Sequence, residues 1–316
     1  MLNDLNGTSD LVLVIGASGL DVVGRLQSEL HLGTSNPAVI RSSAGGSARN
    51  VAENLARLGQ QVSLLSVVGR DHIGADILAY TRNAGVDVSA VYATDNYPTG
   101  FYMGVLNERG ARHFAVDDMR ILQELTEAYL VYNEPLFEQA GLIFLDANLD
   151  DLALKRAFAL AHKHKIPVCA DPISGLLAHR LLPYLHQIKL IAPNSIEAAV
   201  LSGHSFEPGN QQAAIEAACL LVNKGVEMVF VTLAEFGACY ATSETRGHVP
   251  AIRTTVTDPT GAGDALTAAV IYSLMNGIEV DDAARLGISA ASLALRYPGT
   301  VYPDLSLEKL YDELSA

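Results

Sequence analysis

Short apolar runs alternate with amphipathic helical patterns along most of this 316-residue chain. Near-continuous runs of Val, Ile and Leu are typical of strands that are buried on both faces of a parallel sheet. Between them, apolar residues recur at helical spacing. We therefore predict an α/β fold, a doubly wound, mostly parallel sheet sandwiched by helices, with ligands beyond the carboxyl ends of the strands. The predicted strands are residues 11–17, 62–69, 141–147, 166–172, 189–194 and 228–234.

Two stretches, about residues 22–43 and 92–116, interrupt this alternation because they are strand-like but less apolar. In the second stretch, FYMGVL and ARHFAV flank the turn NERG, which predicts a β-hairpin. We interpret the two stretches as a small β-sheet that projects from the main layer. It is either a lid over a site or an ordinary surface hairpin. The whole chain, residues 1–316, is predicted to form one domain with this small sheet attached.

The composition limits the classes of partner. Thirty-five acidic and 21 basic residues give a net charge of −14, whereas a nucleic-acid interface normally needs a basic surface. The sequence contains no uninterrupted apolar stretch of about 18 residues, which a transmembrane helix would need. The N-terminus lacks the basic region of a signal peptide. We therefore expect a cytoplasmic protein that binds a small molecule and neither nucleic acid nor membrane.

Metal-binding patterns are weak. Cys169, Cys219 and Cys239 are far apart and have no metal or redox spacing, so we interpret them as small apolar side chains. His162 and His164 in LAHKHKIP are expected at a polar helix end. We do not expect zinc there, because no partner ligands lie nearby in the sequence.

The densest glycine turn lies in VTDPTGAGDALTAAVIY, residues 256–272. Gly261 and Gly263 permit a tight turn and close approach of a ligand, and a helical pattern follows. Because the first amides of a helix lack intrahelical partners, Gly261, Ala262 and Gly263 predict an anion site. The Gly-Lys-Ser/Thr ending of a P-loop is absent. Asp264 is either a base for an attacking hydroxyl or an ordinary acidic residue at a helix start.

A second glycine turn enters a helix in SSAGGSARNVAENLA, residues 42–56. Gly45 and Gly46 permit close backbone approach, and the Asn50 amide suits a polyhydroxylated ligand. The alternative is a plain strand-to-helix turn with Ser47 as the N-cap. In VIGASGLDVVG, the glycine spacing is not that of a dinucleotide fingerprint, which disfavours a nicotinamide oxidoreductase. Asp21 is interpreted as an acceptor for ligand hydroxyls.

A third candidate follows the predicted strand at residues 189–194. In APNSIEAAVLSG, Asn194 is a good N-cap and Glu197 has the spacing of a capping box. The functional alternative is that both side chains organise a hydrated Mg²⁺ ion.

Four short motifs occur along the chain in the order GGSARN, NSIE, VTLAEFGA and DPTGAGD. In this order they resemble the ribokinase family of sugar and nucleoside kinases, and the resemblance covers nearly the whole chain. The Asp-x-Thr-Gly-Ala-Gly-Asp run is its most specific part. Within that family, GGSARNVAENLARLG, FAVDDMRILQELTEAYL and YPDLSLEKL look most like the pseudouridine kinases.

The resemblance implies a ribokinase-like fold whose small sheet is a lid, and an activity that transfers phosphate from ATP to a ribose 5′-hydroxyl. Pseudouridine is the expected acceptor. Asp264 would deprotonate the hydroxyl, while the amides of residues 261–263 would stabilise the transferring group. Asp21, Gly46 and Asn50 would hold the ribose hydroxyls.

The resemblance also implies nucleotide and metal sites. Asn194 and Glu197 would position Mg²⁺ and the phosphates. Thr232 and Gly237 would line the ATP site.

Some members of that family bind a monovalent cation at the positions of Asp258 and Thr260, so K⁺ is a further expected cofactor. One position departs from the family pattern, since Gly19 stands where many members have Asn. This departure bears on the substrate more than on the chemistry.

Arg49, Thr99 and Tyr102 are candidate contacts to the base of the nucleoside. The alternatives are another sugar or nucleoside kinase, such as a ribokinase or an inosine or adenosine kinase, and a sugar-binding regulatory relative without catalysis. An exposed edge of the small sheet would suit pairing of two subunits, so we expect a homodimer.

Overall fold

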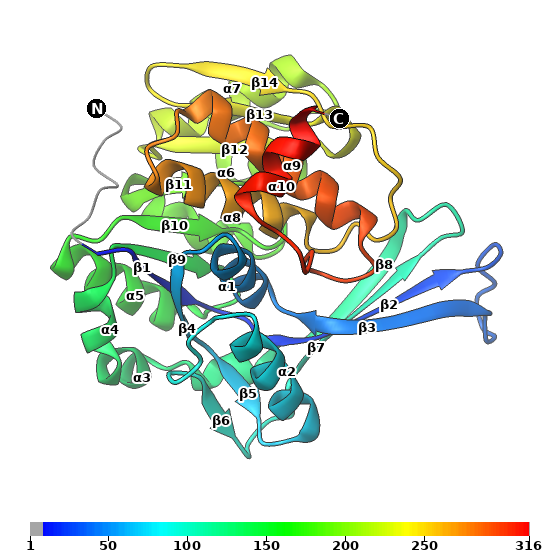
Figure 1. The fold of residues 1–316 in the computed structure, drawn as a ribbon, viewed down its shortest axis with the longest axis horizontal. Helices are drawn as coiled ribbons and strands as arrows, with labels where there is room; N and C mark the ends of the chain where they lie inside the picture. Colours follow the sequence, from blue (N-terminus) through cyan, green and yellow to red (C-terminus); the bar gives the residue numbers. More distant parts are fainter. Residues whose placement is uncertain (1–8, 316) are drawn as a thin grey trace.

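The computed structural model describes residues 9–315 (Figure 1). Its main sheet is parallel except near one edge, where one strand runs antiparallel to both of its neighbours. This arrangement confirms the predicted doubly wound α/β class. In spatial order the eight strands are β14 (Arg246–Val249), β13 (Ala238–Ala241), β12 (Met228–Thr232), β11 (Ile188–Ile191), β10 (Val168–Asp171), β9 (Leu142–Asp146), β1 (Leu11–Ile15) and β4 (Gln61–Leu65).

Helices cover both faces of the main sheet, which explains why its strands are apolar throughout. Val12 and Val14 belong to the core that packs under α1 (Ser47–Arg57) and α8 (Ala262–Met275). Leu13 and Ile15 point the other way, into a second core. The other helices of the first face are α9 (Val280–Arg296) and, packed on it, α10 (Leu307–Ser315). The second face holds α3 (Glu127–Tyr132), α4 (Glu134–Gln139), α5 (Asp151–His164), α6 (Ser195–Ser202), α7 (Gln211–Asn223) and the 3₁₀ helix η3 (Ala178–Gln187).

A four-stranded sheet projects beyond the main layer (Figure 1). Its hydrogen-bonded order is β3 (Ala38–Gly45), β2 (Gly19–Leu26), β7 (Gly100–Leu106) and β8 (Arg112–Asp118). β7 and β8 are antiparallel, so the predicted hairpin is present. This sheet is the small β-sheet that the sequence predicts.

The structure moves the boundaries of that small sheet. It begins at Gly19 and at Gly100, whereas residues 92–94 form β6 (Tyr92–Thr94), which pairs instead with β5 (Val67–Gly69). The prediction of a single strand over residues 62–69 is therefore wrong. It divides at Ser66, whose hydroxyl donates to the carbonyl of Gly16 over 2.6 Å, and its two halves join different sheets.

The antiparallel pair β13 and β14 was absent from the predicted strands. Both strands have four residues, and the second is partly exposed, so neither shows the long apolar run of the parallel strands. The remaining elements are α2 (His72–Asn83) and two short 3₁₀ helices, η2 (Arg120–Glu124) and η4 (Ala234–Phe236). Across residues 9–315, no helix combines the length and the apolarity needed to cross a bilayer.

Candidate active site

A cavity of about 440 Å³ lies between the carboxyl ends of the main sheet and one face of the small sheet. From the main sheet it is lined by Asp171 at the end of β10, Asn194 after β11 and Thr232 at the end of β12. From the small sheet it is lined by Asp21 and Tyr102, which are direct neighbours on β2 and β7. This is the position that a doubly wound fold predicts for a ligand.

The glycine turn before α8 opens into this cavity. Gly261 is the N-cap, with φ 82°, and a Cβ at this residue would overlap the carbonyl oxygen of Thr300. Only glycine meets both conditions. The first amides of a helix have no intrahelical acceptor, and within the described part of the chain those of residues 262–264 have no other protein acceptor either. Since Gly261 and Gly263 line the cavity, these amides can donate to an anion bound there.

Asp264 lies in the first turn of α8 and faces the same cavity. Its two carboxylate oxygens accept hydrogen bonds from Ser47 Oγ and Asn50 Nδ2, each over 2.7 Å. Burial raises the pKa of Asp264, although these two hydrogen bonds and the charge of Arg49 oppose the rise. A raised pKa brings a carboxylate closer to the range in which it is an effective general base.

The second glycine turn begins α1, and its N-cap is Gly46 rather than Ser47. Gly46 has φ 91°, and a Cβ there would overlap the backbone of Ala17 and Ser18. The Ser47 hydroxyl turns toward Asp264, so the interpretation of Ser47 as an N-cap is wrong. Two conditions therefore require glycine at position 46: a positive φ and close contact with the loop after β1.

Asp21 and Gly45 touch across β2 and β3. The Asp21 carboxylate occupies the space that a Cβ at residue 45 would need. Burial raises the pKa of Asp21 to about 7; the Arg49 charge lowers it, and the carboxylates of Asp264 and Asp258 raise it further. Gly19, on the same strand, lies so close to Gly100 that a side chain at residue 19 would overlap the Gly100 carbonyl. This contact accounts for glycine at the position where many members of the family have Asn.

Asp171 is a cavity residue that the sequence analysis missed. Its Oδ2 lies 3.3 Å from the Ser47 hydroxyl, which also contacts Asp264. A hydroxyl has one proton, so it donates to only one of the two carboxylates at a time. Burial and the neighbouring Asp264 raise the pKa of Asp171 well above its usual range. Its position at the carboxyl end of a predicted buried strand was the signal that could have identified it.

Asn194 and Glu197 form a complete capping box at the start of α6, as the spacing predicts. The Glu197 carboxylate accepts from the Asn194 backbone N–H over 2.8 Å and from its side-chain amide over 2.6 Å. Both residues also line the cavity. Burial raises the pKa of Glu197, while its Asn194 hydrogen bonds and the Arg112 charge lower it. Asn194 and Glu197 therefore cap α6 and line the cavity at the same time.

Four further predicted positions divide between the cavity and its surroundings. Thr232 and Thr260 line the cavity. Asp258 is buried and accepts from the backbone N–H of Thr260 over 2.9 Å. Gly237 follows η4 with φ 92° and packs against the backbone of residues 249–251, outside the cavity lining.

The three candidate base contacts lie in different surroundings. Tyr102 lines the cavity, and its hydroxyl accepts from Arg112 over 3.3 Å. Thr99 donates from its hydroxyl to Asp71 over 2.7 Å and does not line the cavity. Arg49 is fully buried behind the cavity wall. The structure therefore offers no support for ligand contacts from Thr99 or Arg49.

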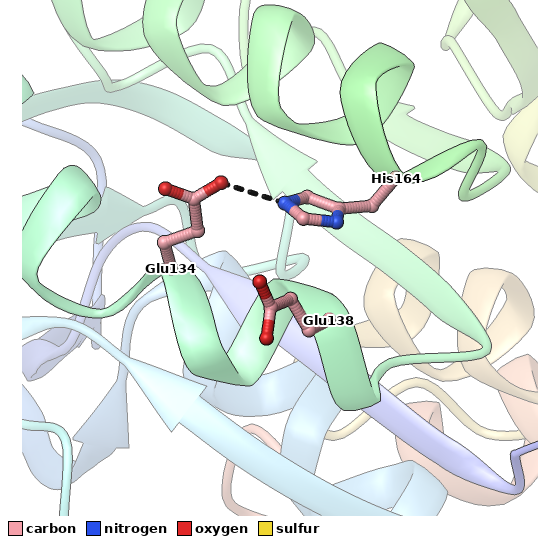
Figure 2. A group of neighbouring side chains, drawn as sticks. All are labelled: Glu134, Glu138 and His164. Carbon is pink, nitrogen blue, oxygen red and sulfur yellow. Dashed lines mark hydrogen bonds and ion pairs between the residues drawn. The ribbon is translucent and has the colours of Figure 1, made fainter.

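Among residues 9–315, a group of three ligand-type side chains lies outside the cavity (Figure 2). Glu134 and Glu138 on α4 approach His164 at the end of α5. Because Glu134 is 30 residues away in the chain, the sequence near His164 did not reveal this group. Glu134 accepts from His164 over 2.7 Å and from Lys163 over 2.6 Å. These ion pairs already explain the group as a link between α4 and α5.

Comparisons with known proteins agree with this geometry. The chain is 32% identical over 299 residues to the pseudouridine kinase of Escherichia coli K12, covering 94% of each chain. It is 30% identical over 286 residues to the guanosine-inosine kinase of Exiguobacterium acetylicum, covering 89% of this chain and 93% of that protein.

Solved structures share the architecture. The ribokinase of Arabidopsis thaliana, complexed with ribose and ATP, aligns with a TM-score of 0.80 over 97% of this chain and 98% of that one, at 23% identity. This match confirms a ribokinase-like fold. The family model for pfkB family carbohydrate kinases matches residues 9–306. The chain therefore belongs to the pfkB family of carbohydrate kinases.

Proposed function

We propose that this protein transfers the γ-phosphoryl group of ATP to the 5′-hydroxyl of a ribose-containing nucleoside, with pseudouridine as the acceptor. The observation that carries the proposal is the start of α8, where uncapped amides and the Asp264 carboxylate face one cavity. Phosphoryl transfer depends on positioning and on stabilising charge, and these groups supply both.

In the proposed reaction, the acceptor hydroxyl lies beside Asp264, which takes its proton as the oxygen attacks phosphorus. The amides of residues 261–263 donate to the oxygens of the migrating group. The bond from that phosphorus to the ADP oxygen breaks, and ADP leaves. Asn50 and Ser47 hold Asp264 in one orientation.

The ribose would lie between the two glycine turns. Asp21, Gly46 and Asn50 line this part of the cavity. Asp21 can accept from ribose hydroxyls when ionised, and the absence of a side chain at Gly46 leaves room for the sugar. Tyr102, on the facing small sheet, is the candidate contact to the base. We propose that this sheet acts as a lid, because one of its faces forms a wall of the cavity.

The donor set of the cavity fits a hard divalent cation. Glu197 and Asp171 offer carboxylate oxygens and Asn194 an amide oxygen, which are the ligand types that Mg²⁺ prefers. These residues would hold Mg²⁺, which supplies charge neutralisation for the ATP phosphates. A solved Escherichia coli structure in complex with ATP and Mg²⁺ has the same fold, with a TM-score of 0.82.

We also propose positions for the ATP site and for a K⁺ site. Thr232 lines the cavity at the end of β12 and Gly237 directly precedes β13, and we place the ATP site beside these two residues. Asp258 and Thr260 present oxygen atoms immediately before the glycine turn, as a K⁺ site would require. Unchanged turnover when K⁺ is added to an assay free of Na⁺ and K⁺ would contradict the K⁺ site.

The similarity to the pseudouridine kinase supports pseudouridine as the acceptor, and a substrate panel tests it. The protein is incubated with ATP, Mg²⁺ and pseudouridine, uridine, inosine, adenosine or ribose, and ADP and the 5′-phosphate are measured. The highest kcat/KM with pseudouridine supports the proposal. A higher value with inosine, adenosine or ribose makes the protein another nucleoside or sugar kinase. No ADP with any acceptor favours the non-catalytic relative.

We also propose a homodimer formed through the small sheet. Ile40, Met103, Phe114 and Val116 lie on strands of this sheet, and each is at least 40% exposed. The strand registers place them on the face opposite Asp21 and Tyr102. Exposed apolar faces of this kind often mark contacts between proteins. Sedimentation equilibrium that gives a monomer at micromolar concentration would contradict this proposal.

A further inference from the structure

Arg49 is a fully buried arginine on α1, directly behind the cavity wall. Its side chain has no exposed surface and does not line the cavity. Burying a guanidinium is unfavourable unless its charge and its N–H groups find partners. The partners of the Arg49 guanidinium therefore indicate its role.

The charge is balanced on the same helix. Arg49 pairs with Glu53, one turn further along α1, and Glu53 is also fully buried. Glu53 has a second partner, since Arg57 Nε donates to it over 2.8 Å. The Glu53 carboxylate is therefore shared by two arginines. Arg49 also donates to Asn50, whereas Arg57 donates to the carbonyl of Pro303.

The remaining N–H groups of Arg49 hold the backbone that frames the cavity. Its Nε donates to the carbonyl of Gly45 and one Nη to that of Ala44, each over 3.0 Å. The same Nη donates to Thr300 Oγ1 over 3.2 Å. The carbonyl of Thr300 packs against Gly261, the N-cap of α8. Arg49 thus connects the strand before α1 with the loop that supports the anion site.

Arg49 also determines how the Asn50 amide is oriented. Its guanidinium donates to Asn50 Oδ1, which leaves Asn50 Nδ2 to donate to Asp264 over 2.7 Å. The reversed amide would set its NH₂ group against the guanidinium donors and its oxygen against the carboxylate. Both contacts would be repulsive, because guanidinium has no acceptor and an ionised carboxylate has no donor.

We propose that Arg49 is a positioning residue for phosphoryl transfer, which acts through Asn50 to hold the Asp264 carboxylate toward the acceptor hydroxyl. This inference rests on the proposed kinase activity. It replaces the earlier expectation that Arg49 contacts the base of the nucleoside. Misplacement of a reacting group by about 1 Å can cost on the order of 100-fold in rate, so the effect falls on kcat.

The experiment compares Arg49→Met with Arg57→Met, because both variants remove one partner of Glu53. In each case the other arginine remains to balance the buried carboxylate. We expect both to lower the thermal midpoint. Arg49→Met should also lower kcat by about tenfold or more with little change in KM for ATP, whereas Arg57→Met should keep kcat within about twofold of wild type.

A double-mutant cycle separates positioning from general support of the fold. If Arg49 acts through Asn50, Arg49→Met should have little further effect on kcat in an Asn50→Ala background. If Arg49→Met does not fold, Arg49→Met with Glu53→Leu removes both buried charges and serves in its place.

The outcomes are distinguishable. Equal kcat for the Arg49 and Arg57 variants, or additive effects of the Arg49 and Asn50 variants, would overturn the role of Arg49 and leave the kinase activity intact. A wild-type protein that phosphorylates none of the acceptors would overturn the kinase proposal itself, and with it this inference.

Discussion

The helices α1 and α8 both begin at a glycine with positive φ, yet the hydrogen-bond acceptors of their first amides differ. At α1, the amide of Ala48 donates to Asp146 over 3.3 Å and that of Arg49 donates to the carbonyl of Ala17 over 3.1 Å. At α8, no hydrogen bond from the amides of residues 262–264 to a protein acceptor is found among residues 9–315, and the glycines line the cavity. The start of α8 therefore leaves more donors for a ligand than the start of α1 does.

The difference shows that a glycine turn before a helix does not by itself make an anion site. What decides is whether the fold supplies an acceptor. Asp146 at the end of β9 fills that role for α1, and no residue does so for α8 among those described. The two helices then meet through the hydrogen bond from Asn50 to Asp264. In the proposed reaction, α1 positions the base and α8 carries it.

The largest expected effect is that of Asp264→Asn. An amide cannot accept the proton of the acceptor hydroxyl, so kcat should fall by at least about 100-fold. The thermal midpoint should not fall, because the neutral amide removes a charge that burial disfavours. Steady-state kinetics and a melting curve measure both.

Asp282→Asn is the matched control, because Asp282 is an exposed acidic residue in the first turn of α9. It has the dipole role that Asp264 would have under the alternative interpretation. Near-normal turnover of both variants would make Asp264 only a helix-start residue.

Gly261→Ala should destabilise the fold more than Gly263→Ala. A residue with a Cβ at φ 82° costs about 1–3 kcal/mol, and here the added atom would also overlap the carbonyl of Thr300. At Gly263 a Cβ would meet nothing within 4 Å, and Ala is the better helix former. Chemical denaturation measures the difference, and equal free energies of unfolding would contradict the account of this turn.

Asp146→Asn should weaken the start of α1, although Asp146 itself does not line the cavity. The carboxylate accepts from the amides of Ala17, Ala48 and Asn148. An asparagine would turn an NH₂ group toward one of these donors, and an unsatisfied buried donor costs about 1–3 kcal/mol. A thermal midpoint equal to that of wild type would show that another group can cap these amides.

The smallest expected effect is a pH-dependent one at Asp21. Burial raises its pKa to about 7 in the fold, above the value of about 3.9 in an unfolded chain. The resulting stabilisation is complete below about pH 4 and is lost as the pH rises through 7. Asp21→Asn should therefore raise the thermal midpoint by a few degrees at pH 8, and this gain should shrink as the pH falls toward 6. A gain that is constant with pH would contradict the raised pKa.

Local patterns predicted the elements that depend on neighbours in the sequence. The parallel strands, the hairpin of β7 and β8 and the capping box at Asn194 follow from apolar runs, turn residues and cap spacing, all of which act within a few residues. The turn at Gly261 was recognisable because the glycines and Asp264 are adjacent in the chain.

Long-range contacts account for what the sequence did not reveal. Ser47 has the local features of an N-cap, but the Asp264 carboxylate, 217 residues away, takes its hydroxyl. Arg49 was expected to contact the base, but its side chain is fully buried and its partner Thr300 is 251 residues distant. The strand at residues 62–69 divides because Ser66 bonds to Gly16. Each outcome depends on packing between segments.

The most direct measurement is a crystal structure with the acceptor nucleoside, Mg²⁺ and a non-hydrolysable ATP analogue. The account predicts that the 5′-oxygen lies about 2.6–3.2 Å from a carboxylate oxygen of Asp264, with the γ-phosphate against the amides of residues 261–263. A 5′-oxygen bound elsewhere in the cavity, or an Asp264 side chain turned away from it, would contradict the account.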